Sequence, residues 1–471
     1  MKTSSWSLEH SAVSAELKRF IAEKLAQVRA ETRAIGHEMS PEFKSLFAAA
    51  EKGDWRGATN SLAAIRRSWQ QQGESSGSKS CTVYPVEWSA ALEIAGALEE
   101  FATGEEKYAA AFATDIIASI PPGSVYFGGT DAGRFLVTAL SKSHVNADPF
   151  FTLTQNALAD RSYLRYARSM YENRIYIPTA EDSTNAFSYY LEDAQRRQKE
   201  NKLRPGECLE EVEGKMQISG AISVMAINAA LSKLMFDKNP ELEFYVEESF
   251  PLDWMYPHLS PHGLILKINR QPLSELSNAV VESDREYWKR YIGPMIGDWL
   301  SYDTSLSEIV AFVEKVHVNH DLTGFKGDLR YIQNDMPQRN FSKLRSSIGG
   351  VYTWRAQHSE NPADKERMLK EADFAFRQAS ALCPSSPEAV FRYINLLLGE
   401  KLGQKRLDDA ILVVQAAVKL EEASSQPAPR AHLQEDFSHK PFVQSEASPP
   451  KLLTPLGNLL EQLKKLKAKK N

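Results

Sequence analysis

The segment Gly128 to Arg134 (GGTDAGR) carries the residue types and spacing that best fit a ligand site. It separates a short β-branched and aromatic run, expected to be a strand, from residues that favour a helix. Glycines let a ligand approach the backbone, and amides at a helix N-terminus attract anions. The candidate ligand-binding residues are Gly128, Gly129, Thr130, Asp131 and Arg134. Alternatively, Asp131 only caps the helix, because the segment matches neither a Walker A loop nor a dinucleotide fingerprint.

A second strand, turn and helix follow in the same order. Residues 150–154 (FFTLT) predict a strand, Gln155 and Asn156 a turn, and residues 160–171 a helix. If the two strands are parallel neighbours, their turns lie at one edge of the sheet, where open α/β folds bind ligands. We therefore add Gln155 and Asn156 to the candidate ligand-binding residues. The alternative is that both side chains cap the following helix.

The segment DWMYPHLSPHG gathers Asp253, His258 and His262 in a stretch broken by prolines. Loops of this kind often bind ligands, so the three residues are further candidates, and a loop packed over the sheet is the alternative. Pro257 and Pro261 argue against a regular helix that would align the histidines, and no HExxH pattern occurs. We therefore expect no metal site and no cofactor.

Several other residues that could take part in metal binding or acid-base chemistry are expected at ordinary surface positions. Residues 317–321 (HVNHD) are expected at a surface helix end, and the pairs Glu210-Glu211 and Glu247-Glu248 on solvated faces. The chain has no G-x-S-x-G nucleophile elbow. No catalytic residue is assigned, and these patterns favour a protein that is not an enzyme.

Composition excludes several classes of protein. The chain of 471 residues is 42% hydrophobic and 25% charged, which is typical of globular proteins, and its net charge of -5 creates no field for nucleic acid. Its three cysteines are far apart, so no disulfide framework is expected, and reduced thiols suggest a cytoplasmic protein. The N-terminus does not resemble a signal peptide. The most apolar stretch, residues 221–236, is interrupted by polar residues and predicts a buried helix and no transmembrane segment.

Strands that alternate with helices predict an α/β core with a mainly parallel sheet and crossover helices, flanked by helical regions. Further strands are expected at 175–177, 243–248 and 263–268, and a hairpin at 209–219. The expected organisation is a helical N-terminal region and linker, the core, a helical region with repeats, a disordered linker and a basic tail helix, with the bounds 1–80, 81–271, 272–422, 423–455 and 456–471.

The helical region after residue 272 contains a pattern typical of tetratricopeptide repeats. Small alanines let two helices approach closely, an aromatic ring fills the gap, and a proline ends the second helix. A second, degenerate copy follows thirty-eight residues later. The residues expected to pack the repeats are Gly349, Tyr352, Ala372, Phe376, Ala379, Pro384, Ala410, Val414 and Ala417. A generic helical hairpin is the alternative.

The last segment predicts an amphipathic helix whose end is rich in lysine. It follows a stretch rich in Pro and Ser that favours disorder. The tail helix is expected either to dock on a partner or to make a peripheral contact with an anionic membrane.

PPGSVYFGGTDAGRF, FFTLTQNALADRSYLRYARSMY and GLILKI resemble the soluble C-terminal portion of bacterial membrane glycosyltransferases similar to protein O-mannosyltransferases. The likeness covers about residues 115–420 in the order of elements. It implies a detached soluble module, because this chain lacks a multi-span membrane half, and it implies no catalytic residue here. An extra threonine, Thr130, separates this turn from the Gly-Asp turn of the family.

We therefore expect a soluble scaffold or interaction module, associated with glycosyl transfer or cell-envelope glycans, that binds a protein partner through its C-terminal repeats or a glycan-related ligand. The alternative is a transferase or hydrolase with a cleft at the C-terminal edge of the sheet, built from Asp131, Arg134, Asn156, Asp253 and His258.

Overall fold

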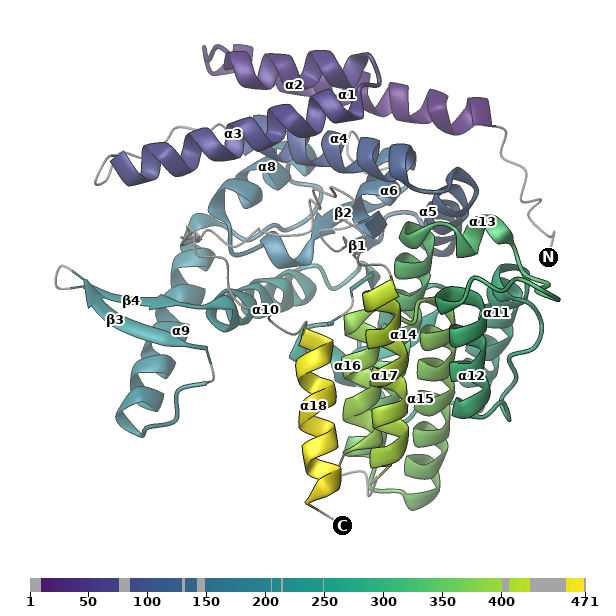
Figure 1. Ribbon diagram of the computed structural model, residues 1–471. Helices are drawn as coiled ribbons and strands as arrows, with labels where there is room; N and C mark the ends of the chain where they lie inside the picture. Colours follow the sequence, from purple (N-terminus) through teal and green to yellow (C-terminus); the bar gives the residue numbers. More distant parts are fainter. Residues whose placement is uncertain are drawn as a thin grey trace. The chain divides into compact units, whose positions relative to one another are not determined.

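The structure is a computed structural model. It describes residues 10–75, 85–128, 132–141, 149–204, 206–212, 215–248, 250–399, 406–423 and 455–469. The chain forms two compact units (Figure 1). Unit one comprises the described residues up to Glu247 together with Leu252–Met255. Unit two comprises Glu248–Pro251 and the described residues from Tyr256 onward.

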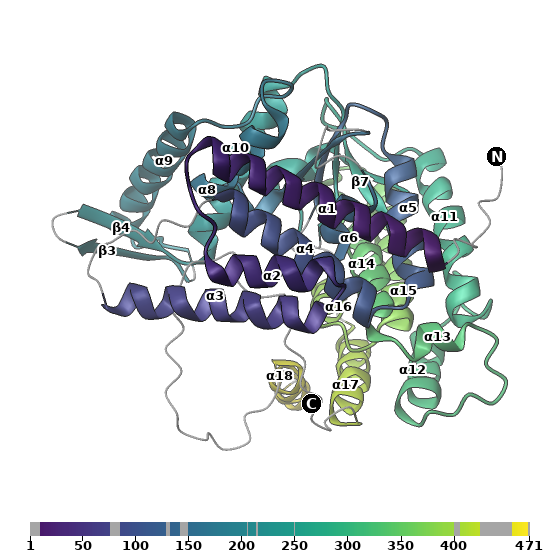
Figure 2. The same ribbon diagram turned by 90° about the horizontal axis from the view of Figure 1, so that it is seen from above.

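Unit one begins with a group of amphipathic helices, seen in purple and blue in Figure 2. In α2 the buried side chains Phe43, Leu46, Phe47 and Ala50 follow the helical period, and Ser40 caps the helix. The neighbours α1 and α3 pack against α2, and both also contact α4. The bounds of these and the next helix are α1 His10–Ala34, α2 Pro41–Glu51, α3 Trp55–Ser75, α4 Pro85–Thr103 and α5 Glu106–Ser119.

Unit one contains a three-stranded parallel sheet. In unit one, β1 (Val125–Gly128) lies between β2 (Phe151–Thr154) and β5 (Phe244–Val246) and is parallel to both. Helix α6 (Ala132–Leu140) connects β1 to β2. The remaining crossover, from β2 to β5, contains η1 Gln155–Ala157, α8 Arg161–Tyr171, α9 Ala180–Lys199, β3 Cys208–Val212, β4 Lys215–Ser219 and α10 Ala221–Lys238. Parallel strands with crossover helices confirm the predicted α/β core for this unit.

The strands of unit two depart from the expected parallel pattern. After the 3₁₀ helix η2 (Asp253–His258), β6 (Leu259–His262) pairs antiparallel with β7 (Ile265–Ile268). The prediction of a loop throughout 253–263 was therefore wrong, because its first half forms η2 and its second half forms β6. Gly263, at a φ of 63°, supplies the left-handed turn between the strands.

Two further sequence predictions for unit one had opposite outcomes. The hairpin at 209–219 is confirmed, with Leu209 opposite Ile218. Residues 175–177 are not a strand, although Ile175 and Ile177 are buried. Here the Asn239 side chain accepts from the Tyr176 N–H at 2.8 Å and donates to its carbonyl at 3.1 Å. One amide group therefore satisfies the backbone that a neighbouring strand would have paired.

Unit two is helical after its strand pair, and α14 to α18 lie in sequence beside one another (Figure 1). The last helix packs on α17 through buried Leu456, Leu460 and Leu463, so its apolar face is used within the unit. The bounds are α11 Asn278–Ile296, α12 Leu306–Val313, η3 Glu314–Val318, α13 Leu329–Ile332, α14 Asp335–His358, α15 Pro362–Leu382, α16 Pro387–Leu397, α17 Leu407–Ala423 and α18 Pro455–Ala468.

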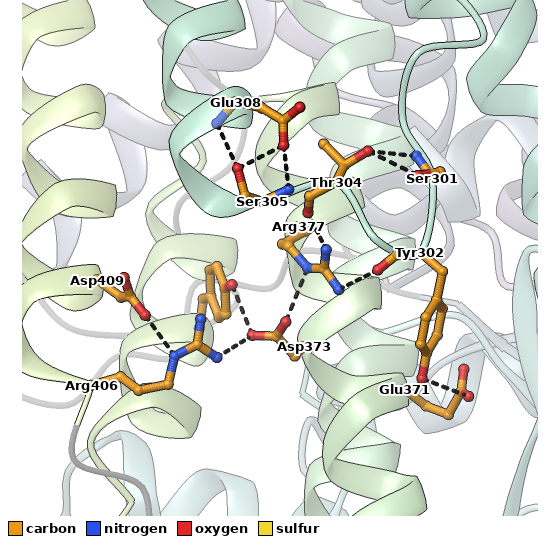
Figure 3. Close-up of polar contacts among 11 residues, drawn as sticks. Ser301, Tyr302, Thr304, Ser305, Glu308, Glu371, Asp373, Arg377, Arg406 and Asp409 are labelled. Atoms are coloured by element: carbon orange, nitrogen blue, oxygen red, sulfur yellow. Dashed lines mark hydrogen bonds and ion pairs between the residues drawn. The ribbon is translucent and has the colours of Figure 1, made fainter.

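Asp373 joins three successive segments of this helical array (Figure 3). From α15 its carboxylate accepts from the Tyr393 hydroxyl of α16 at 3.0 Å and from Arg406, just before α17, at 2.7 Å. It also forms an ion pair with Arg377, one turn along α15, at 2.9 Å. Burial, and then the Asp373 charge, raise the pKa of Tyr393 well above its usual value. The tyrosine therefore stays a hydrogen-bond donor.

Arg377 extends this network to the start of α12 (Figure 3). Its guanidinium donates to the Tyr302 carbonyl at 3.0 Å and to the Thr304 carbonyl. The residues that follow, Ser305 and Glu308, form a capping box that begins α12. Charge-assisted hydrogen bonds thus fix the helix start against α15.

Candidate functional site

The carboxyl ends of three parallel strands meet at one edge of the sheet in unit one. Gly128, the last residue of β1, is paired with Thr154, the last residue of β2. On the other side Phe127 is paired with Val246, so β5 ends at the same level. The chain leaves β1 toward β2 and later crosses to β5 on the opposite side. The ends of β1 and β5 therefore define a topological switch point, where open α/β sheets bind ligands.

Buried polar groups surround the end of β2. Thr154 and Gln155 are fully buried, and Gln155 Nε2 donates to Asn156 Oδ1 at 3.1 Å. Asn228, reaching in from α10, donates to the Asn156 carbonyl at 3.0 Å and accepts from the Ala159 N–H at 2.7 Å. The Asn228 side chain therefore fixes the turn by hydrogen bonding to the backbone of Asn156 and Ala159.

Two of these groups keep unused hydrogen-bonding capacity. Thr154 Oγ1 and Gln155 Oε1 are buried and have no hydrogen-bond partner among the residues that the structure describes. A buried polar atom without a partner costs about 1–3 kcal/mol, so such atoms are rare unless something else satisfies them. Gln155 Oε1 can only accept a hydrogen bond. The edge is thus suited to a group that donates hydrogen bonds.

Glu247 lies at the same edge, directly after β5. Its N–H donates to the Phe127 carbonyl at 2.8 Å, and its side chain is only 1% exposed. In unit two, Glu248 is also buried. The prediction that this acidic pair belongs to a solvated face was therefore wrong. An acidic pair that directly follows a buried strand was the available clue, since strand ends in α/β sheets carry functional groups.

The structure brings together only some of the predicted ligand residues. Gly128, Gln155 and Asn156 share the edge, whereas Gly129, Thr130 and Asp131 lie outside the described residues. Arg134 belongs to α6, and its side chain also lies outside the description. Asp253 is exposed in unit one, at the start of η2.

The two histidines of the same segment lie in unit two, at opposite ends of β6. His258 Nδ1 lies 2.7 Å from the Asn269 carbonyl, whose residue returns a hydrogen bond to the His258 carbonyl. His262 is paired with Ile265 beside the turn. Within the described ranges no group of three or more His, Cys, Asp or Glu residues could hold a metal ion.

Besides Glu247, Asn228 and Thr154 are edge residues that the sequence reasoning missed as site candidates. Asn228 stands out in the sequence as an amide in an otherwise apolar helix, and this contrast could have identified it. That helix also differs from its prediction as a wholly buried one, because Ile222, Met225 and Ile227 are only half-buried.

His317 is the clearest correction among the other candidates. It was expected at a surface helix end, but in unit two it is 6% exposed within the π-helical turn η3, with its ring edge-on to Phe312 at 5.8 Å. Burial, and then the nearby His320, lower its pKa to about 4. A neutral buried imidazole is a packing group here.

This burial predicts a pH dependence of stability. Between about pH 6.5 and pH 4 the unfolded chain binds a proton at His317 that the folded protein excludes, so stability falls as the pH drops through this window. The expected loss from His317 is up to about 3 kcal/mol. Urea unfolding at pH 7 and pH 4.5 should show a smaller loss for His317→Gln than for the wild type. The exposed control His358→Asn, at a histidine that does not affect His317, should keep the wild-type dependence, and equal slopes in all three proteins would contradict the assignment.

The comparisons with known proteins identify no relative of this chain. No protein-family model, no curated protein and no solved structure matches it. The likeness to soluble portions of glycosyltransferases therefore remains a prediction. In the described part of the chain, no helix is both long and apolar enough to span a bilayer.

Proposed function

We propose that unit one binds a small polar ligand at the carboxyl edge of β2, β1 and β5, and that the helices of unit two are a scaffold. The observation that carries this proposal is the pair of buried, unpartnered atoms Thr154 Oγ1 and Gln155 Oε1 beside a topological switch point. A purely structural edge would be expected to satisfy these atoms within the protein.

The groups at the edge favour a ligand that donates hydrogen bonds. Gln155 offers an amide oxygen, Thr154 a hydroxyl and Glu247 a carboxyl group close by in the fold. Hydroxyl-bearing ligands such as nucleosides and monosaccharides have this chemistry, which suits the glycan-related ligand implied by the resemblance. Because Thr154 and Gln155 are fully buried, the edge must open before a ligand reaches them, and we expect slow association and slow dissociation.

Thermal unfolding in the presence of nucleosides, monosaccharides and their phosphates tests this proposal. A ligand at one hundred times its Kd is expected to stabilise the wild type by about 2.7 kcal/mol. Thr154→Val and Gln155→Met should abolish that shift. The matched control is Thr152→Val, the same change two residues earlier on β2, which should retain the shift. A shift that survives in both edge variants would reject the site.

We also propose that α14 and α15 form a tetratricopeptide-like hairpin, because their packing matches the repeat pattern. A Cβ placed on Gly349 would lie 3.1 Å from the Phe376 ring, so the glycine permits close helix packing. Phe376 stacks in turn on Tyr393 of α16, with ring centroids 5.5 Å apart. Tyr352, Ala372, Ala379, Ala410, Val414 and Ala417 are buried, and Pro384 lies between α15 and α16. This packing is what the repeat pattern requires.

We propose that α14 serves as a scaffold for another segment of the same chain, the residues at the end of η2 and the start of β6. Arg355 of α14 donates to the carbonyls of Pro257 at 2.8 Å, Leu259 at 3.1 Å and Tyr256 at 3.3 Å. The Tyr256 ring stacks on Trp354, 5.9 Å between centroids. One face of α14 thus binds the end of η2 and the start of β6, mainly through their backbone carbonyls. A protein partner is then expected on other surfaces of the array.

Replacing Arg355 tests this scaffold role. Arg355→Met removes charge-assisted hydrogen bonds to buried carbonyls and is expected to destabilise unit two by about 3 kcal/mol. Limited proteolysis should then cleave within residues 250–262 faster than in the wild type. Arg330→Met, at an exposed arginine of the same unit, is the control. Unchanged cleavage in Arg355→Met would show that the segment is held by other contacts.

Attachment to a membrane or a partner through the tail helix remains a proposal with narrower support. The apolar face of α18 is packed on α17, and Lys467 pairs with Asp408 at 2.7 Å. Exposed lysines such as Lys465 and Lys469 are what remains for an anionic surface, since Lys464 pairs with Glu461 at 3.3 Å.

A further inference from the structure

A separate hollow lies between α1 and α2, away in sequence from the strand edge. It is open to solvent, has a volume of about 240 Å³ and is lined by residues of both helices and of their connection. At about 30 Å³ per water molecule, it has room for roughly eight waters. That volume suits a molecule of fragment size rather than a cofactor, since cofactor sites typically exceed about 300 Å³.

The floor of the hollow is apolar. Leu25 of α1 and Phe47 of α2 are 1% and 2% exposed, and Met39 and Ala48 complete the surface. Thr32 also lines it, but its hydroxyl donates to the Val28 carbonyl at 2.8 Å. The floor therefore favours a hydrocarbon group over a fully hydrated ion.

The rim of the hollow is cationic. Arg29, Arg33 and Lys44 line it, against the single carboxylate Glu51. Arg29 lies 3.5 Å from Glu51, and Lys44 pairs with Glu38 at 2.6 Å. Among the residues that the structure describes, Arg33 has no acidic partner. An unpaired guanidinium beside an apolar cavity matches a carboxylate, which it can bind through two parallel hydrogen bonds.

We infer that this hollow binds a small amphiphilic carboxylate, with the hydrocarbon portion on Leu25 and Phe47 and the carboxylate at Arg33. The excess of cations excludes an amine, and the apolar floor disfavours inorganic phosphate. This inference is independent of the ligand proposed for the strand edge, because it uses other residues and another chemistry.

Calorimetric titration of the full chain tests the inference with four probes: hexanoate, acetate, hexan-1-ol and inorganic phosphate. Hexanoate should bind at least tenfold more tightly than each of the other three, and raising the salt from 50 to 500 mM should weaken it. If acetate or phosphate binds as tightly as hexanoate, the apolar floor does not contribute to binding. If hexan-1-ol binds as tightly, the cations do not contribute. If hexanoate does not bind, the proposed site is rejected.

Two variants at exposed positions locate the binding without disturbing the core. Arg33→Gln should weaken hexanoate at least fivefold, and Ala48→Glu, which places a carboxylate in the hollow, should abolish binding. The matched control Lys18→Gln removes one charge from an exposed position of α1 and should leave the affinity unchanged. Loss of affinity in the control equal to that in Arg33→Gln would show general attraction to positive charge and overturn the inference.

Discussion

Replacing Arg345 by methionine is expected to lower the free energy of unfolding of unit two by about 3–5 kcal/mol. Arg345 of α14 and Asp284 of α11 are both fully buried and form an ion pair at 2.7 Å. The Tyr352 hydroxyl donates to the same Asp284 oxygen at 2.8 Å, and Arg345 Nε donates to Gln378 at 2.7 Å. Without the arginine, the carboxylate remains in the interior without its compensating charge.

The double variant Arg345→Met, Asp284→Leu separates the effect of an unpaired charge from a loss of packing. Removing both partners is expected to restore most of the lost stability, because neither charge remains in the interior. Arg330→Met, which removes an exposed guanidinium from its pair with Asp328, should cost less than 1 kcal/mol. Urea unfolding measures all three variants. A double variant as unstable as the single one would show that packing, rather than charge, dominates.

Replacing Lys24 by methionine is expected to have a similar effect in unit one, about 3–5 kcal/mol. Lys24 of α1 is 0% exposed and lies 2.7 Å from Glu93 of α4. Tyr166 of α8 donates to the same Glu93 oxygen at 2.7 Å, so the three groups join three helices. The methionine keeps most of the side-chain volume, so the expected loss comes from the buried carboxylate.

Adding Glu93→Gln to Lys24→Met should recover most of this loss, because a neutral amide can still accept from Tyr166. The exposed pair of Lys44 and Glu38 supplies the matched control, and Lys44→Met should change the stability by less than 1 kcal/mol. Chemical unfolding followed by tryptophan fluorescence gives the comparison. A mild effect of Lys24→Met alone would mean that Tyr166 suffices to stabilise the buried Glu93.

Local patterns predicted the parts of the fold that depend on local physics. The β-branched and aromatic run before Gly128 and the FFTLT run both form strands, and the parallel pairing of Gly128 with Thr154 shows that the two strands end at one edge. The hairpin at 209–219 and the helix after Asp160 were also predicted correctly, the latter because Asp160 caps it.

Features that depend on distant partners were not predictable in this way. Residues 175–177 look like a strand, but Asn239, more than sixty residues later, satisfies their backbone instead. Glu247 looks solvated by type and is buried because it follows a buried strand. His317 looks like a surface residue by its type and sequence neighbours, but in the fold its ring packs against the ring of Phe312. In each case tertiary context overrides residue type, and a single sequence carries little of that context.

The most direct test of the account is a high-resolution crystal structure of the wild type soaked with the hydroxyl-bearing compound that stabilises it most. A ligand hydroxyl is expected within hydrogen-bonding distance of Gln155 Oε1 or Thr154 Oγ1, at the carboxyl ends of β1, β2 and β5. Ligand density elsewhere on the molecule, with both atoms bonded only to protein groups, would contradict it.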